Sequence, residues 1–143
     1  ATTTGTTENS PVDRVVVVPG KTITDDTPTD LFSIDVAAGT SCGGTIIWET
    51  STVNAGLQFQ IMSGITNYSV FNNAGTMTAA LVSSPNQAAS ITTGTLENLF
   101  IADQSSSTFT IKLSHNSSLT PTSGHPRIQY TLLNNCYKNV TIL

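Results

Sequence analysis

Apolar and polar residues alternate along much of this chain, in runs of five to nine positions. In one such run Phe32, Ile34 and Val36 are separated by Ser33 and Asp35. Successive side chains of a β-strand point to opposite faces of the sheet, so this pattern is typical of a strand with one buried face. No window shows a sustained apolar period of 3.6 residues, and we therefore expect little or no helix.

Turn-forming residues separate these runs at intervals of about 8 to 12 positions. The segments Asn54-Ala55-Gly56 and Asn72-Asn73-Ala74-Gly75 each lie between two runs, which indicates two hairpins. The stretch 37–44 contains three glycines and is expected to be a loop. Together these signals predict about eight or nine short strands in an antiparallel β-sandwich, jelly-roll-like, with a closed barrel less favoured.

Several of the expected strands have a defined apolar face. In 45–53 that face carries Ile46 and Trp48, and in the following run, 57–62, apolar residues at 57, 59 and 61 alternate with Gln58, Gln60 and Met62. Later strands repeat the pattern, and we expect their apolar sets to point inward. These sets are Phe109, Ile111 and Leu113, and Ile128, Tyr130 and Leu132.

The polar positions are filled by hydroxyls and amides rather than by charges. The 143 residues include 25 Thr, 16 Ser and 11 Asn but only 14 charged residues, which is typical of hydroxyl-faced strands. A chain of this length can bury a core as one domain. Residues 1–12 are Thr-, Gly- and Ser-rich, so we expect a flexible arm there, followed by a single domain over 13–143.

Charge and hydropathy argue against two classes of partner. The net charge is −4, and the five basic residues are scattered, so the chain has no electrostatic footprint for nucleic acid. The longest apolar run, Val15 to Val18, is far shorter than the ~20 residues of a membrane helix. The N-terminal segment does not have the pattern of a signal peptide, which leaves the compartment open.

Two cysteines, Cys42 and Cys136, lie 94 positions apart and lack the close spacing of a zinc site. If the fold brings them together, a disulfide between them would close a long loop and stabilise the fold by ~4 kcal/mol. Two unpaired, half-buried thiols are an equal alternative.

No catalytic or metal-binding pattern stands out. We expect His115 and His125 at the end of a strand and in a turn, with loop or surface roles. The acidic cluster Asp25, Asp26 and Asp30 could offer oxygens to Ca²⁺, but its spacing matches no calcium loop, so a solvated turn is favoured. The chain is therefore not expected to be an enzyme, and no cofactor or metal is expected.

Aromatic residues and glycosylation motifs add two weaker signals. Trp48, Tyr68, Tyr130 and Tyr137 could form a sugar-binding platform, although core packing is favoured for Trp48. The acceptor pattern for N-glycosylation occurs at 67–69, 116–118 and 139–141, which is close to chance in a chain this rich in Asn, Ser and Thr.

Several segments resemble small β-rich accessory proteins of tailed bacteriophages. The resemblance extends over about residues 28–133. It is carried by Asp30-Leu-Phe-Ser-Ile-Asp-Val36, Gly43-Gly-Thr-Ile-Ile-Trp48, Gln58-Phe-Gln with Ser63-Gly64, Asn72-Asn-Ala-Gly-Thr-Met-Thr78, Thr-Phe-Thr-Ile at 108–111, Asn-Ser-Ser-Leu-Thr at 116–120 and Arg-Ile-Gln-Tyr-Thr-Leu at 127–132. It implies a virion component such as a capsid decoration protein, a head- or tail-fibre module or a tail-associated knob.

The expected function is therefore that of a non-enzymatic virion structural protein. It would form a homo-oligomer, with a trimer favoured, and bind other virion proteins such as the major capsid protein; neither nucleic acid nor a membrane is an expected partner. One alternative is a head- or tail-fibre module that binds a receptor or carbohydrate. Another is an extracellular filament or surface-layer subunit that exchanges an arm or an edge strand. The partner-binding arm would be Ala1, Thr2, Thr3, Thr4, Gly5, Thr6 and Thr7.

Overall fold

The structure is a computed structural model, and it describes residues 15–83, 88–135 and 140–143. Within these ranges the chain forms ten β-strands, and none of the described residues is helical. No helix in the described part could therefore span a membrane. The strands are β1 (Val15–Thr22), β2 (Thr29–Asp35), β3 (Ser41–Val53), β4 (Phe59–Asn73), β5 (Thr76–Ser83), β6 (Ala88–Ile91), β7 (Leu96–Gln104), β8 (Thr108–Ser117), β9 (Arg127–Asn134) and β10 (Val140–Ile142).

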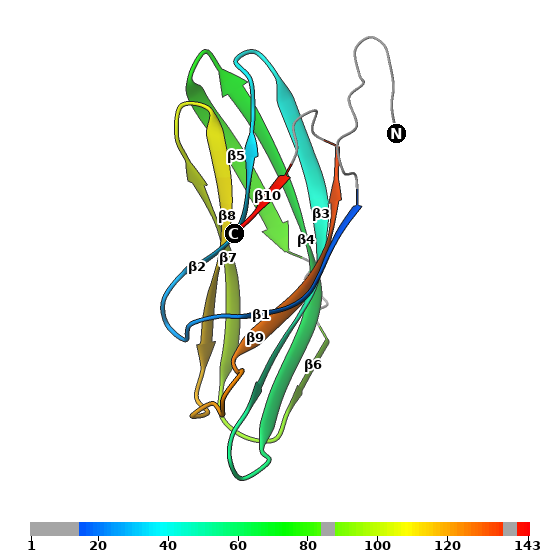
Figure 1. Ribbon diagram of the computed structural model, residues 1–143, viewed down its shortest axis with the longest axis vertical. Helices are drawn as coiled ribbons and strands as arrows, with labels where there is room; N and C mark the ends of the chain where they lie inside the picture. Colours follow the sequence, from blue (N-terminus) through cyan, green and yellow to red (C-terminus); the bar gives the residue numbers. More distant parts are fainter. Residues whose placement is uncertain (1–14, 84–87, 136–139) are drawn as a thin grey trace.

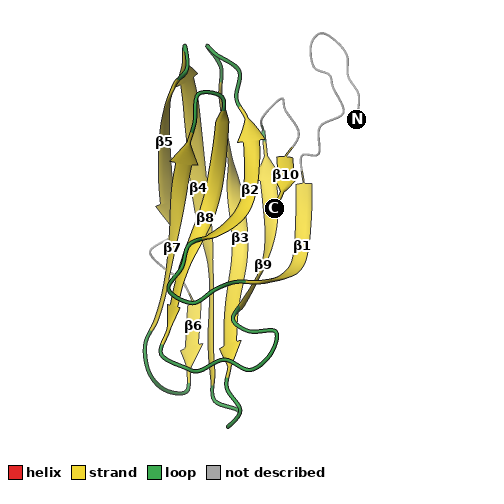
Figure 2. Ribbon diagram, turned by 60° about the vertical axis from the view of Figure 1, so that its left-hand side comes forward, coloured by secondary structure: helices red, strands yellow, loops and turns green. Residues whose placement is uncertain are grey.

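The strands form two antiparallel sheets that face each other, as Figures 1 and 2 show. The larger sheet has six strands in the order β1-β9-β3-β4-β5, with β6 on β4 next to β5, and the smaller has the order β10-β2-β8-β7. The predicted antiparallel β-sandwich is confirmed. The jelly-roll topology is not confirmed. A jelly roll has eight strands arranged as two Greek keys, whereas here the consecutive strands β3, β4 and β5 lie side by side in one sheet.

Both predicted hairpins are present. The first joins β3 to β4, and the side chain of Asn54 closes its turn by accepting hydrogen bonds from the backbone N–H groups of Gly56 (3.0 Å) and Gln58 (2.9 Å). The second joins β4 to β5 through Ala74 and Gly75, whose φ angles are 53° and 95°. Two central residues with positive φ are the feature of a type I′ turn, which suits the twist of the strands.

The glycine-rich stretch 37–44 is not wholly a loop, because β3 begins at Ser41. Gly43 and Gly44 lie in this strand, where neighbouring backbone comes very close. A Cβ on Gly43 would be 2.5 Å from the carbonyl oxygen of Tyr68, and one on Gly44 would collide with the carbonyl oxygen of Leu133. The glycines therefore allow close contact within the sheet rather than a flexible loop.

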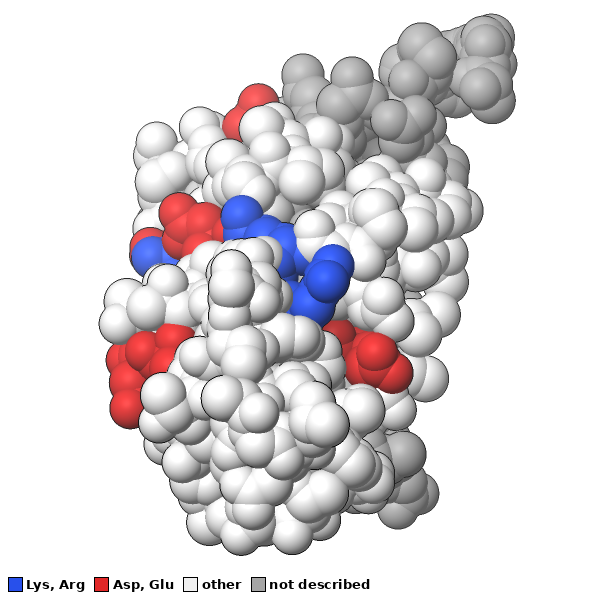
Figure 3. Space-filling view, turned by 60° about the horizontal axis from the view of Figure 1, so that its bottom comes forward, with Lys and Arg blue, Asp and Glu red and all other residues white. Residues whose placement is uncertain are grey.

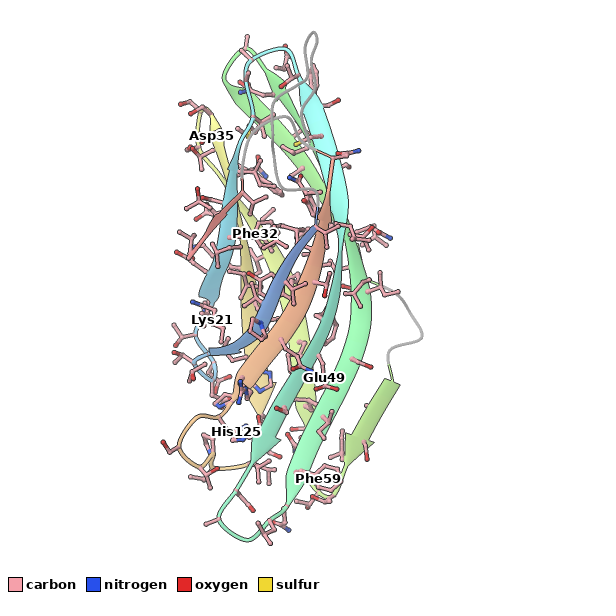
Figure 4. The ribbon with its side chains drawn as sticks, turned by 45° about the vertical axis from the view of Figure 1, so that its right-hand side comes forward. Lys21, Phe32, Asp35, Glu49, Phe59 and His125 are labelled. Carbon is pink, nitrogen blue, oxygen red and sulfur yellow. The ribbon has the colours of Figure 1, made fainter. Side chains whose placement is uncertain are left out.

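The core lies between the sheets and contains the residues that the alternation predicts. The inward side chains predicted for β2, β8 and β9 are at most 3% exposed. Phe32, which Figure 4 places between the layers, is fully buried. The run 57–62 differs, because Gln60 is buried and Leu57 is 82% exposed. Since β4 continues unbroken to Asn73, its buried face is set by Tyr68 and Val70, and period 2 brings Gln60 onto that face.

Candidate functional site

The two histidines differ in their surroundings. His115 lies in β8 and is fully buried, so the expectation of a loop or surface role is wrong for it. Its Nδ1 is 2.7 Å from Oδ1 of Asn98, and its Nε2 is 3.2 Å from Oγ1 of Thr52. The ring points inward because the alternation of β8 continues through His115. Its two neutral hydrogen-bond partners make the burial of an imidazole acceptable. Its burial lowers the pKa of His115, against the opposing charges of two nearby aspartates.

His125 lies in a turn, as predicted, next to a cis bond to Pro126. It is half-buried, and its Nδ1 is 3.3 Å from the carbonyl oxygen of Ser51. A hollow of about 290 Å³ beside it is also lined by Glu49 and Arg127. Figure 4 shows His125 and Glu49 in the lower half of the molecule. The hollow offers a carboxylate and a guanidinium, but no hydrogen bond joins His125 to a carboxylate or to a serine hydroxyl among the described contacts.

Two members of the predicted acidic cluster, Asp25 in the β1–β2 connection and Asp30 in β2, have structural partners. Asp25 accepts a hydrogen bond from the backbone N–H of Ser117 (2.8 Å), and Asp26 lies in the turn with a φ of 60°. Asp30 lies 3.6 Å from Nζ of Lys112, which also pairs with Asp103 at 3.0 Å. In the described ranges no three His, Cys, Asp or Glu side chains gather as metal ligands would. Asp25 and Asp30 therefore face different partners.

The aromatic residues considered as a sugar platform are in the core. Trp48, Tyr68 and Tyr130 are 2–4% exposed, which confirms core packing for Trp48 and removes these three from any exposed groove. Trp48 donates its indole N–H to Thr66 (3.0 Å) and packs on Phe100. Burial raises the pKa of the Tyr130 hydroxyl to about 12 and raises that of Tyr68 as well. Tyr137 lies outside the described residues.

Two of the predicted sites lie outside the described ranges. The first is the N-terminal arm, 1–12. The second is Cys136, so its disulfide with Cys42 stays a prediction, although no described cysteine is a free thiol. Of the glycosylation motifs, those at Asn67 and Asn116 have exposed asparagines, and the one at 139–141 lies partly outside the described residues.

The outer side of the larger sheet has a continuous surface that carries no charge. The strand register places its residues in two adjacent rows across the sheet. One row runs Val15, Leu133, Thr45, Asn67 and Val82 over β1, β9, β3, β4 and β5, and the other runs Val17, Thr131, Ile47 and Ile65 over β1, β9, β3 and β4. We call these nine residues the uncharged face.

Six of the nine side chains are apolar and exposed. Their exposed fractions range from 39% for Leu133 to 64% for Val17 and Val82. The polar members are two threonines and one asparagine, and Thr45 donates a hydrogen bond to Asn67 (2.7 Å) within the surface. Single exposed apolar residues are ordinary, but a contiguous apolar patch rimmed by polar residues marks an interaction surface.

The surface next to the uncharged face differs at its two ends. Toward the β4–β5 turn, Gly43, Ser69 and Ala80 are paired across three strands, and their small side chains leave a shallow hollow of about 830 Å³ beside Phe71. Toward the β3–β4 turn come Glu49, hydrogen-bonded to Gln129 (3.0 Å), and then Arg127. Figure 3, which turns the lower end of the molecule forward, shows a few acidic and basic side chains, some of them side by side, among mostly uncharged residues. Charge therefore borders the uncharged face on one side.

The size of this surface fits a protein contact. Strands lie about 4.8 Å apart and residues of one face about 6.6 Å apart along a strand. The two rows therefore cover roughly 500 Å² of the sheet plane together with the next two rows toward the β4–β5 turn, which are Gly43-Ser69-Ala80 and Ser41-Phe71-Thr78. Side chains add relief to that area. Specific interfaces begin at roughly 600 Å² of accessible surface per partner. The surface is thus large enough for a small specific interface.

The hydroxyl-rich strand pattern of the sequence does not locate this surface. The signal is present at Ile47, which is apolar and lies between Ile46 and Trp48 of a predicted apolar face; Ile65 is a further apolar residue of the same surface. A strand with apolar residues on both faces indicates either burial on both sides or an exposed apolar surface. Their assembly into rows depends on the pairing of β9 with β3 across 80 residues, which no local pattern contains.

No protein-family model matches the chain, and no curated protein matches it. Two solved structures are similar to it in part. The Acinetobacter baumannii phage AM24 tailspike protein aligns with a TM-score of 0.46 and 9% identity, covering 91% of this chain and 26% of that one. The Acinetobacter phage vB_ApiP_P1 tailspike protein aligns with a TM-score of 0.39 and 12% identity, covering 100% and 24%. The chain thus spans about a quarter of either tailspike.

Proposed function

We propose that the protein is a non-enzymatic structural component of a bacteriophage particle and that it self-associates through the uncharged face. The uncharged face is the observation that carries the proposal. Six exposed apolar side chains in two paired rows lose contact with water when a partner covers them, which favours association by about 25 cal/mol for each Å² of apolar surface. Part of that gain offsets the entropy lost on association.

A second copy of this chain is the partner that the surface fits best. The chain carries a net charge of −4, so copies repel one another wherever their acidic groups come close. The uncharged face allows two copies to meet without placing like charges opposite each other. It also avoids the desolvation of charges, which is costly in a buried contact. Closed symmetric assembly is the usual outcome for such a surface, and a trimer remains the favoured number.

The geometry around the histidines supports a role without catalysis. A nucleophile needs a general base within hydrogen-bond reach, and a base needs access to substrate. His115 is fully buried between the sheets, and its two ring nitrogens face Asn98 and Thr52. His125 faces a backbone carbonyl oxygen. Neither arrangement supplies an activated serine.

The virion setting rests on the sequence segments that resemble small phage accessory proteins. Among virion roles, capsid decoration places the protein on a particle surface by way of the major capsid protein, and a fibre module places it in the tail or head fibres. The amount of protein per purified particle distinguishes the two roles, because capsid symmetry requires many copies and a fibre requires few. A filament subunit instead forms long polymers without other components.

The experiment is a comparison of solution mass by light scattering. Ile47→Lys places a charge within the uncharged face, and the control Leu99→Lys places one on an exposed apolar position of β7 in the other sheet. We expect the wild-type chain and the control to have a mass that is a small multiple of 15.0 kDa, and Ile47→Lys to be a monomer. A monomeric wild type, or an equal effect of both variants, contradicts the proposal.

A further inference from the structure

The interior of the sandwich changes from apolar to polar toward the β3–β4 turn. Inward residues of four strands show the change: Ile46 and Trp48 are followed by Thr50 and Thr52 in β3, and Phe109, Ile111 and Leu113 by His115 and Ser117 in β8, while β4 contributes Gln60 and β7 contributes Asn98. We call Thr50, Thr52, Gln60, Asn98, His115 and Ser117 the polar cluster. All of them except the half-buried Asn98 are buried.

Hydrogen bonds of the polar cluster connect the two sheets. Thr52 in the larger sheet contacts His115 in the smaller one at 3.2 Å, and Asn98 donates to Thr50 across the sheets at 2.9 Å. Ser117 donates to Oε1 of Gln60 at 2.6 Å. At this end, specific polar contacts therefore join the layers where apolar packing does so elsewhere.

The hydrogen-bond pattern identifies the proton position on His115. Nδ2 of Asn98 donates to Thr50 and contacts Sδ of Met62 (3.4 Å), which orients Oδ1 of the same amide toward His115. Because that oxygen can only accept, Nδ1 of the imidazole carries the hydrogen. The other nitrogen, Nε2, then accepts from the hydroxyl of Thr52. The network is complete with a neutral ring.

Protonation of the ring disrupts this arrangement. A second N–H at Nε2 points at Thr52, whose hydroxyl must then turn its hydrogen elsewhere, and a positive charge appears among neutral side chains. The side chains that contact the ring from β3 and β7 are Thr52 and Asn98, and neither of them ionises. The charges nearby are Asp25 and Asp26 of the β1–β2 connection, which favour the proton. Burial outweighs them and lowers the pKa of His115.

We propose that the polar cluster is an acid-sensitive latch, which holds the two sheets together at this end when His115 is neutral and loosens them when it is protonated. Solvent reaches the cluster from outside, because Asn98 and Met62 line a hollow of about 480 Å³ together with Asp26. The stability that the latch supplies is complete above the ordinary histidine pKa of about 6.5. It decreases as the pH falls through that value toward the lower pKa of the folded state, because the unfolded chain then binds the proton more readily.

Amide hydrogen exchange at pH 7.5 and pH 5.5 tests the latch, with rates divided by the intrinsic rate at each pH. In the wild type we expect peptides covering the β3–β4 turn to exchange up to about tenfold faster at pH 5.5, one unit below the ordinary pKa. Asn98→Asp keeps the shape of the amide but pairs the protonated ring with a carboxylate, so it should reduce this difference. The control His125→Asn removes the other histidine and should leave the difference unchanged.

An NMR titration of the wild-type imidazole provides a second test that needs no variant. We expect the Nδ1–H form of His115 and a titration midpoint below about 6.5, the pH near which the change in exchange begins. Equal normalised exchange at both pH values overturns the proposal, as does an Nε2–H ring or a response that disappears in His125→Asn.

Discussion

Asn72 is the residue whose replacement tests the packing of the sandwich most directly. It is buried at the end of β4, and its side chain bonds to three connections of the fold. Nδ2 donates to the carbonyl oxygens of Val36 (2.7 Å) and Ser106 (3.1 Å), and Oδ1 accepts from the N–H of Gly75 (2.8 Å). One amide therefore ties the β4–β5 turn to the ends of two strands of the other sheet.

We predict that Asn72→Ala lowers the free energy of unfolding by about 3 kcal/mol. A hydrogen bond contributes about 1 kcal/mol net, and three are lost. A buried group left without a partner costs about 1–3 kcal/mol, so entry of water into the space determines whether the loss exceeds this value. Equilibrium unfolding in urea measures it, with the m-value checked for two-state behaviour.

Asn73→Ala is the matched control, because Asn73 is the exposed neighbour in the same turn. We expect a change within about 0.5 kcal/mol, as for most surface positions. Asn72→Asp should destabilise at least as strongly as Asn72→Ala near neutral pH, since a carboxylate oxygen would then face two carbonyl oxygens. A loss below about 1 kcal/mol for Asn72→Ala, or equal losses at the two asparagines, refutes the reasoning.

Two further predictions concern close packing and hydroxyl groups. Gly44→Ala should lower the free energy of unfolding by about 1–3 kcal/mol, because its Cβ would collide with the carbonyl oxygen of Leu133. Gly56→Ala should cost less than about 1 kcal/mol, because a Cβ there would lie 3.5 Å from its nearest neighbour. Thermal and urea unfolding measure both losses, and equal losses would contradict the explanation. Tyr68→Phe should be neutral or stabilising, because the Tyr68 hydroxyl is buried without a hydrogen-bond partner. Tyr130→Phe should lower the free energy of unfolding by about 1 kcal/mol, because it removes the 3.2 Å hydrogen bond from the Tyr130 hydroxyl to the carbonyl oxygen of Leu31. The reverse order of the two losses in urea unfolding would contradict this explanation.

The sequence predicts the fold where the pattern is local. The period of two identifies the buried faces of β2, β8 and β9, and turn residues identify both hairpins. The pattern fails at Gln60, because its burial depends on the continuity of β4 and on the partners Thr93 and Ser117, which are distant in sequence. The glycine-rich pattern predicts a loop at 43 and 44, although these glycines lie in β3 and allow close approach of neighbouring backbone.

The candidate surface and the polar cluster could not be predicted in the same way. Each combines residues from strands that are far apart in the sequence, and only the register determines which residues become neighbours. His115 illustrates the difference. Its position among polar residues at the end of a predicted strand favours a loop, whereas β8 continues to Ser117, so that its period of two places His115 in the interior, opposite Asn98 of β7. Long-range pairing therefore determines the chemistry of both regions.

Hydroxyl-radical footprinting by mass spectrometry tests the central proposal, that copies of this chain associate through the uncharged face. In the single chain Ile47 and Ile65 are 46% and 43% exposed, and Leu57 and Leu99 are 82% and 63% exposed. At concentrations where the protein is an oligomer, we predict that Ile47 and Ile65 lose most of their reactivity relative to dilute protein, while Leu57 and Leu99 keep theirs. Unchanged reactivity of both isoleucines in an oligomer would show that a different surface forms the contact.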